Sequence, residues 1–175
     1  MKRMLCALLA LICIACPAWA EVVLQPISPT PSAAPVGESF SGDGISLALP
    51  AGFALLTQDA LAGYAAAVES DYPGAARIVM AAADEARGAF VALLLTESDD
   101  SAADAAREAA ERILGDSESV AEVQYGDNAC AALACAIGER TYTLYFLSDG
   151  ARVLVVAVSA LEEREVAEIL TGLQF

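Results

Sequence analysis

The sequence predicts an α+β fold in which an antiparallel β-sheet packs against two to three α-helices. Segments with the alternating pattern of strands follow one another across short polar turns, and stretches with helical spacing interrupt them at three places. The apolar run from Phe90 to Leu95 is typical of a strand that is covered on both faces. The resulting order is strand, helix, strand pair, helix, several strands and helix, which implies an antiparallel sheet with helices packed on it.

The first strand and the first helix are predicted before residue 75. Apolar residues alternate with small ones from Ile45 to Leu49, which is the period of a half-buried strand, and Pro50 ends the run. Thr57 is a suitable N-cap for the helix that follows, and Tyr72-Pro73-Gly74 would end that helix.

A pair of strands comes next, from Ala75 to Ala83 and from Ala89 to Thr96. A short polar turn around Glu85 to Gly88 joins them. Because the second strand contains the unbroken apolar run, we expect it to lie in the middle of the sheet.

The second half of the chain adds a helix, several strands and a last helix. Asp99-Asp100-Ser101 would cap a helix from Ala102 to Leu114. Asp149-Gly150 is suited to a tight hairpin turn between two of the later strands. The last helix, from Leu161 to Leu170, has one apolar stripe and an acidic opposite face. The later strands are predicted at residues 119–125, 131–137, 140–147 and 152–159.

The N-terminal residues read as an export signal. Lys2 and Arg3 precede an apolar run of about a dozen residues, too short to span a bilayer, which takes roughly 20. Ala18 and Ala20 fit the small-x-small cleavage pattern, so we expect cleavage after Ala20. The alternative is lipidation of Cys16, which would leave the protein membrane-anchored.

Cleavage after Ala20 would divide the chain into three parts. These are a signal peptide (1–20), a Pro/Ser-rich linker (21–39) and a single α+β domain (40–175). The expected location is periplasmic or secreted.

The charge of the chain argues against two classes of partner. It has 24 acidic residues against nine basic ones and no histidine. Nucleic acids and anionic membrane surfaces are bound through basic groups, so neither is expected as a partner. We expect no membrane span either.

Two cysteines would remain in the exported domain, Cys130 and Cys135. An even pair in an oxidising compartment favours a disulfide between them. Residues five apart in one straight strand, however, lie about 16 Å apart on opposite faces, so the bond requires a turn or bulge. Asp127-Asn128 just upstream would allow an irregular start, and we therefore expect the disulfide together with an irregular backbone.

The residues do not predict a catalytic, cofactor-binding or metal site. Without histidine, Ser-His-Asp and Cys-His arrangements are excluded. The adjacent acidic pairs Asp84-Glu85, Asp99-Asp100 and Glu162-Glu163 are interpreted as caps, turns or solvated faces. Asp43-Gly44 and Asp149-Gly150 are interpreted as turns rather than calcium ligands.

Two segments carry a resemblance to a known family. They are "ISLALPAGF" (45–53) and the C-terminal "SDGARVLVVAVSALEEREVAEILTGLQF" (148–175), which ends in a helix followed by Leu173 and Phe175. The chain resembles the PsbP-like fold family, including small bacterial periplasmic proteins of the DcrB type. The resemblance implies a non-enzymatic accessory or assembly factor that works through protein contacts, with no catalytic residues to transfer.

The expected function is that of a non-enzymatic exported accessory or binding protein with a protein partner that the sequence does not identify. An exposed aromatic patch around Tyr142 and Tyr145 would indicate such a contact surface. The alternatives are an enzyme that uses carboxylates or a metal, recognisable by acidic residues converging in one pocket, and a carrier of a small apolar ligand held between sheet and helix.

Overall fold

The computed structural model describes residues 37–62, 76–137 and 140–175. Its centre is a seven-stranded sheet with the strand order β3-β4-β5-β9-β8-β7-β6, in which every neighbouring pair is antiparallel. The strands are β3 (Ala54–Leu55), β4 (Arg77–Asp84), β5 (Ala89–Glu97), β6 (Val120–Tyr125), β7 (Asn128–Ile137), β8 (Arg140–Ser148) and β9 (Arg152–Ser159). The predicted α+β class and antiparallel sheet are confirmed.

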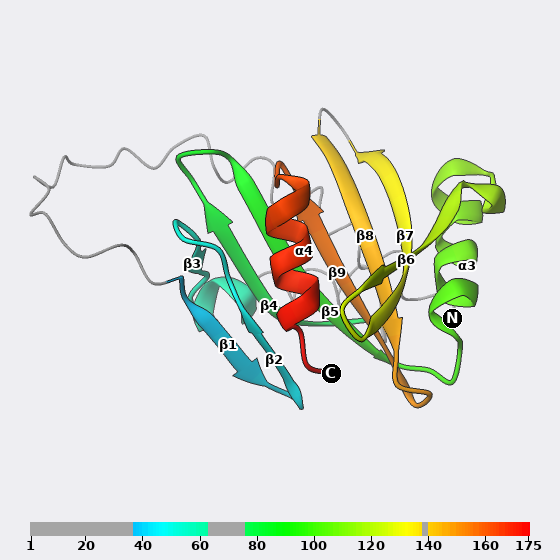
Figure 1. Ribbon diagram of the computed structural model, residues 1–175, viewed down its shortest axis with the longest axis horizontal. Helices are drawn as coiled ribbons and strands as arrows, with labels where there is room; N and C mark the ends of the chain where they lie inside the picture. The colour runs from blue at the N-terminus through cyan, green and yellow to red at the C-terminus, as the bar shows by residue number, and fades with distance from the viewer. Residues whose placement is uncertain (1–36, 63–75, 138–139) are drawn as a thin grey trace, which may run out of the picture.

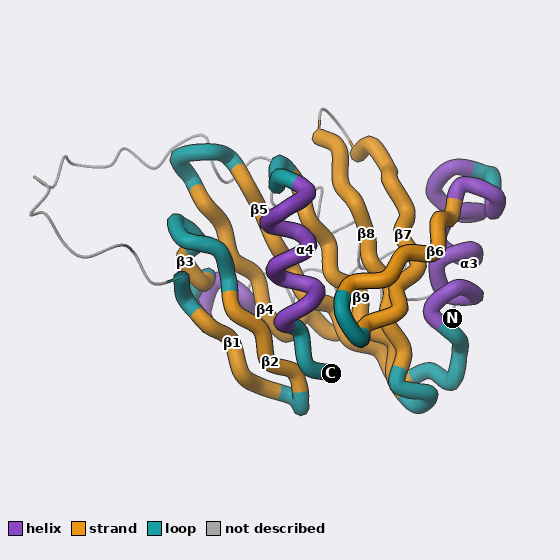
Figure 2. Tube along the Cα trace, viewed as in Figure 1, coloured by secondary structure: helices purple, strands orange, loops and turns teal. Residues whose placement is uncertain are grey.

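The two faces of the sheet are covered by different elements (Figure 1). Helix α3 (Ala102–Leu114) packs on one face. Helix α4 (Glu163–Gly172) lies on the other face beside the hairpin of β1 (Ser39–Gly42) and β2 (Ile45–Ala48) (Figure 2). The strands β4, β5, β7, β8 and β9 send alternate side chains into the two hydrophobic cores.

Strand β5 lies inside the sheet, between β4 and β9, as its apolar run predicts. Val91, Leu93 and Leu95 point to the α4 core, whereas Phe90, Ala92 and Leu94 point to the α3 core. Burial on both faces explains why this strand has no polar alternation.

The helix N-caps predicted from the sequence are present in the structure. Thr57 Oγ1 accepts a hydrogen bond from Ala60 N at 3.3 Å, and residues 58–62 are helical. The rest of that predicted helix lies outside the described residues. Ser101 Oγ accepts from Asp104 N at 3.1 Å at the start of α3, whose predicted bounds are confirmed.

Several boundaries differ from the sequence prediction: β7, for example, begins at Asn128 rather than at residue 131. Helix α4 starts and ends two residues later than predicted, because Ala160 has φ 57° and the chain turns there before the helix begins. Strand β1 begins at Ser39, the last residue of the predicted linker, and pairs with β2. The hairpin at Asp149-Gly150 is confirmed, with Gly150 at φ 86°.

The predicted disulfide between Cys130 and Cys135 is wrong. Both are free, buried thiols. β7 pairs with both of its neighbours in unbroken register, without the turn or bulge that a bond requires. Cys130 therefore points to the α4 core and Cys135 to the α3 core, on opposite faces of the sheet.

None of the helices in the described ranges is long and apolar enough to cross a membrane.

Candidate functional site

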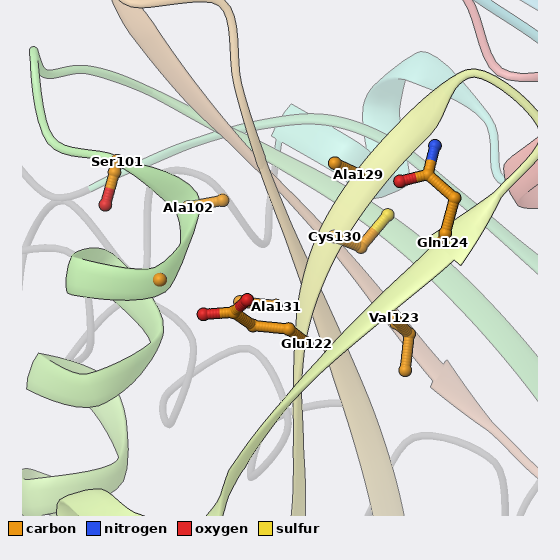
Figure 3. Close-up of a pocket in the computed structure, with 9 residues that line it drawn as sticks. Ser101, Ala102, Glu122, Val123, Gln124, Ala129, Cys130 and Ala131 are labelled. Atoms are coloured by element: carbon orange, nitrogen blue, oxygen red, sulfur yellow. The ribbon is translucent and has the colours of Figure 1, made fainter.

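A hollow of about 410 Å³ lies on the surface between the start of α3 and the hairpin of β6 and β7 (Figure 3). Small apolar residues from both elements line it: Ala102, Ala103, Ala129 and Ala131, with Val123 and Cys130 beside them. Three polar residues complete the lining: Ser101, Glu122 and Gln124. Polar and apolar atoms contribute almost equally to the exposed surface of the hollow, which therefore offers hydrogen-bonding groups beside small apolar side chains.

The hollow follows from the way α3 covers the sheet. The helix packs through buried alanines, among them Ala106 and Ala110, which allow its backbone to approach the strands closely. The first turn of α3 carries Ala102 and Ala103 toward β6 and β7, and these side chains are too short to fill the remaining space.

The polar side chains around the hollow have local partners. Ser101 is the N-cap of α3, and its hydroxyl also donates to Asp104 Oδ2 at 2.7 Å. Glu122 Oε1 lies 3.7 Å from Arg107 Nη2, and Figure 3 shows its side chain extending from β6 toward α3. Gln124 Nε2 donates to Gly126 O at 2.8 Å. The hollow therefore brings together one carboxylate, a hydroxyl and an amide over an alanine floor.

The thiol beside the hollow is not activated. Burial raises the pKa of Cys130 to about 11, so the group stays protonated at neutral pH. Burial also raises the pKa of Cys135. Because the thiolate is the nucleophilic form, neither side chain is prepared for covalent chemistry.

The two tyrosines expected to mark a contact surface are buried. Tyr142 and Tyr145 are 1% and 8% exposed, on opposite faces of β8. The ring of Tyr145 meets that of Tyr125 edge to face, with centroids 5.9 Å apart. Burial and its interaction with Tyr125 raise the pKa of the Tyr145 hydroxyl. Both tyrosines therefore pack in the core and form no exposed patch.

Among the adjacent acidic residues, Asp84 serves as a structural link. Asp84 accepts from Arg87 Nε at 2.7 Å, and Arg87 Nη1 reaches Glu165 Oε1 of α4 at 2.7 Å. The Arg87 guanidinium holds the pKa of Asp84 below its usual range. This network connects the turn between β4 and β5 to α4. No group of three or more potential metal ligands occurs within 37–62, 76–137 or 140–175.

The two Asp-Gly pairs are turns, as predicted. Asp149 Oδ1 accepts from Ala151 N and Arg152 N at 3.0 and 2.8 Å. Asp43 has φ 56°, in the hairpin turn between β1 and β2, and pairs with Arg77 at 2.8 Å.

Sequence reasoning missed the hollow. It identified the alanine-rich helix and the strands of the β6–β7 hairpin separately. The available signal was the presence of five alanines among residues 129–136 of β7, together with an alanine-rich helix. That pattern shows that side-chain volume is small on both elements, but it does not show that they meet.

The comparisons with known proteins concern the fold. No protein-family model matches the chain, and no curated protein does. A crystal structure from Bacteroides thetaiotaomicron VPI-5482 is similar with a TM-score of 0.50 and 15% identity, over 79% of this chain and 48% of that one. This chain thus spans about half the length of that protein.

The solution structure of cyanobacterial PsbP (CyanoP) from Synechocystis sp. PCC 6803 has a TM-score of 0.49 and 13% identity, over 86% of this chain and 99% of that one. At such identities the similarities describe the fold alone.

Proposed function

We propose that this chain is a non-enzymatic accessory or binding protein that is exported and acts through contacts with another protein. The observation that carries the proposal is the hollow, with its alanine floor and its three polar groups next to strand β6. The neighbouring thiol is kept protonated, and the Glu122 carboxylate lies near Arg107, so these groups are suited to binding rather than to bond-making.

A site-specific crosslink tests the contact. A photoreactive amino acid at Gln124, in the hollow, should yield one discrete covalent adduct with a protein of the cell envelope. The same amino acid at Ser41, an exposed residue of β1 in the layer on the other face, is the matched control and should not yield it. Equal adducts from both positions, or none from Gln124, would refute the proposed contact site.

Export rests on the N-terminal sequence features and needs its own test. The protein recovered from the envelope should have an intact mass that begins at Glu21. Because the structure has two free cysteines, alkylation after denaturation should add two groups without prior reduction. An acylated species that begins at Cys16 would instead make the protein a lipoprotein, and an unprocessed cytosolic mass would contradict export.

A second candidate function is a carrier of a small apolar ligand. The alanine lining between helix and sheet favours it. Native mass spectrometry of the protein from the envelope would show a bound small molecule. Ala103→Leu, at a half-buried position of the lining, should displace that molecule by filling the hollow.

A further inference from the structure

Strand β6 is an edge strand of the sheet, and some of its backbone hydrogen-bonding groups point away from the neighbouring strand. β6 is the last strand in the order and pairs only with β7. The two-residue turn Gly126-Asp127 makes Tyr125 and Asn128 the hydrogen-bonded pair that closes the hairpin, and such pairs recur at every second residue. The backbone N–H and C=O groups of Tyr125, Val123 and Ala121 therefore point toward β7. Those of Glu122 and Gln124 point outward, away from the sheet.

The opposite edge of the sheet is formed by the short strand β3. β3 has only two residues, and Leu55 N donates to the carboxylate of Glu38 at 2.8 Å. At β6, no hydrogen bond joins the outward backbone of Glu122 or Gln124 to any other part of the described chain. Both residues are exposed. An exposed edge strand is a template for the addition of another strand.

The surroundings of β6 are strongly acidic. Residues 99–127, which include α3 and β6, contain nine carboxylate side chains and two arginines. Arg107 pairs with Asp104 and lies within reach of Glu122, and Arg112 pairs with Glu108. The uncompensated negative charge next to the open edge is complementary to a basic segment.

We infer that β6 binds an extended, basic segment of a partner protein, which adds to the sheet as an eighth strand. The backbone of the segment pairs with that of Glu122 and Gln124. Basic side chains on one face of the segment reach Glu122 and the hollow, where small side chains leave room for them. This inference rests on the proposed function and specifies where the partner binds and what its chemistry is.

Charge does not favour the two other occupants that the chain itself could supply. A second copy carries the same net charge of −15, so its β6 would be repelled. Residues 21–36 of this chain contain Glu21 and no basic residue. Both therefore lack the positive charge that this edge is suited to receive.

The test uses the protein from the cell envelope and a labelled ten-residue peptide of alternating Arg and Val. Wild type should bind this peptide, with an affinity that falls as the salt concentration rises. Two control peptides share its length: one with Glu in place of Arg, and one N-methylated on alternate amides along one edge. Each should bind at least tenfold more weakly.

Two matched variants locate the binding on β6. Gln124→Pro removes the outward N–H and should lower the affinity at least tenfold, whereas Gln124→Ala removes only the side chain, keeps that N–H and should lower the affinity much less. Glu122→Gln should weaken binding and reduce its salt dependence. Circular dichroism and thermal unfolding check that each variant folds, and the N-methylated peptide tests strand addition even if Gln124→Pro does not fold.

The opposite results overturn the inference. It is wrong if the basic peptide does not bind, if the N-methylated peptide binds equally well, or if the acidic peptide binds as tightly as the basic one. A dimer in sedimentation that Gln124→Pro dissociates would assign the edge to a second copy. An envelope protein that crosslinks at Gln124 while no basic peptide binds would leave the proposed function standing and refute only this mode of contact.

Discussion

The two faces of the sheet are covered by helices that pack in different ways. On one face, α4 inserts the large side chains of Val166, Ile169 and Leu170 between those of the strands. On the other, α3 presents alanines such as Ala106 and Ala110 and lies close to the strands. Large side chains interdigitate and fill the space between layers, whereas alanines fill it only where backbone and sheet almost touch. The surface hollow occurs on the alanine face, at the N-terminal end of α3.

Hydrogen bonds at the margins of the α4 face also connect α4 and the C-terminal residues to the strands. Asn128 Nδ2 donates to Leu170 O at 2.7 Å and to Leu173 O at 2.9 Å, which connects the β6–β7 turn to the end of α4. Ser46 and Gln174 exchange two backbone hydrogen bonds of 2.9 Å, which hold the C-terminal residues on β2. Links from several elements converge on α4, so the comparison predicts that this face is the more sensitive to loss of side-chain volume.

The largest effect is expected from Ile169→Ala. Ile169 is 1% exposed, so its truncation leaves a cavity and should lower the free energy of unfolding by about 2–5 kcal/mol. Urea denaturation of wild type and variant measures this change. Glu168→Ala, on the exposed side of the same helix, is the control and should cost only a few tenths of a kcal/mol. Similar losses from both would contradict the packing described for α4.

The α3 face should respond to an increase in volume. Ala106 is 0% exposed, so Ala106→Leu forces the helix away from the sheet and should cost about 1–3 kcal/mol in urea denaturation. Glu111→Leu adds the same side chain on the exposed side of the helix and should be nearly neutral. If Ala106→Leu were stabilising instead, the space beneath α3 would not be filled as described.

The smallest effect is expected from Asp43→Asn, at the hairpin that covers the α4 face. The Arg77 hydrogen bond keeps the pKa of Asp43 low, so this ion pair stabilises the fold above the unfolded pKa of about 3.9 and is lost as pH falls through the folded pKa. Because the pair is exposed, the loss at pH 7 should be at most about 1 kcal/mol. Asparagine tolerates the left-handed backbone of this turn, which isolates the charge.

Urea denaturation at pH 7 and pH 2.5 checks this. The difference between wild type and Asp43→Asn should be present at pH 7, shrink in high salt and disappear at pH 2.5. A difference that persists at pH 2.5 would mean that the asparagine disturbs the turn itself rather than the ion pair.

Much of the fold could be predicted from local patterns, and the candidate site could not. Three patterns each predict the structure of the segment that contains them: the alternation in β2, the apolar run in β5 and the cap at Ser101. The hollow depends on the distance between α3 and β6, which neither segment encodes alone. The disulfide prediction failed for a related reason. An even number of cysteines gives no information on whether the strand between them is straight. β7 is straight because it pairs continuously with β6 on one side and β8 on the other.

The sequence by itself determined most of the strands and helices, but not β1 or β3. It also determined the turns at Asp-Gly pairs and the acidic character of the surface, because periodicity, turn chemistry and charge are local properties. Only the tertiary structure decided that β5 pairs with β9 and that α3 and α4 take opposite faces. It also decided that β6 is left as the open edge. Strand neighbours are chosen by which distant apolar surfaces bury one another best, and that choice is made by the whole chain rather than by any segment of it.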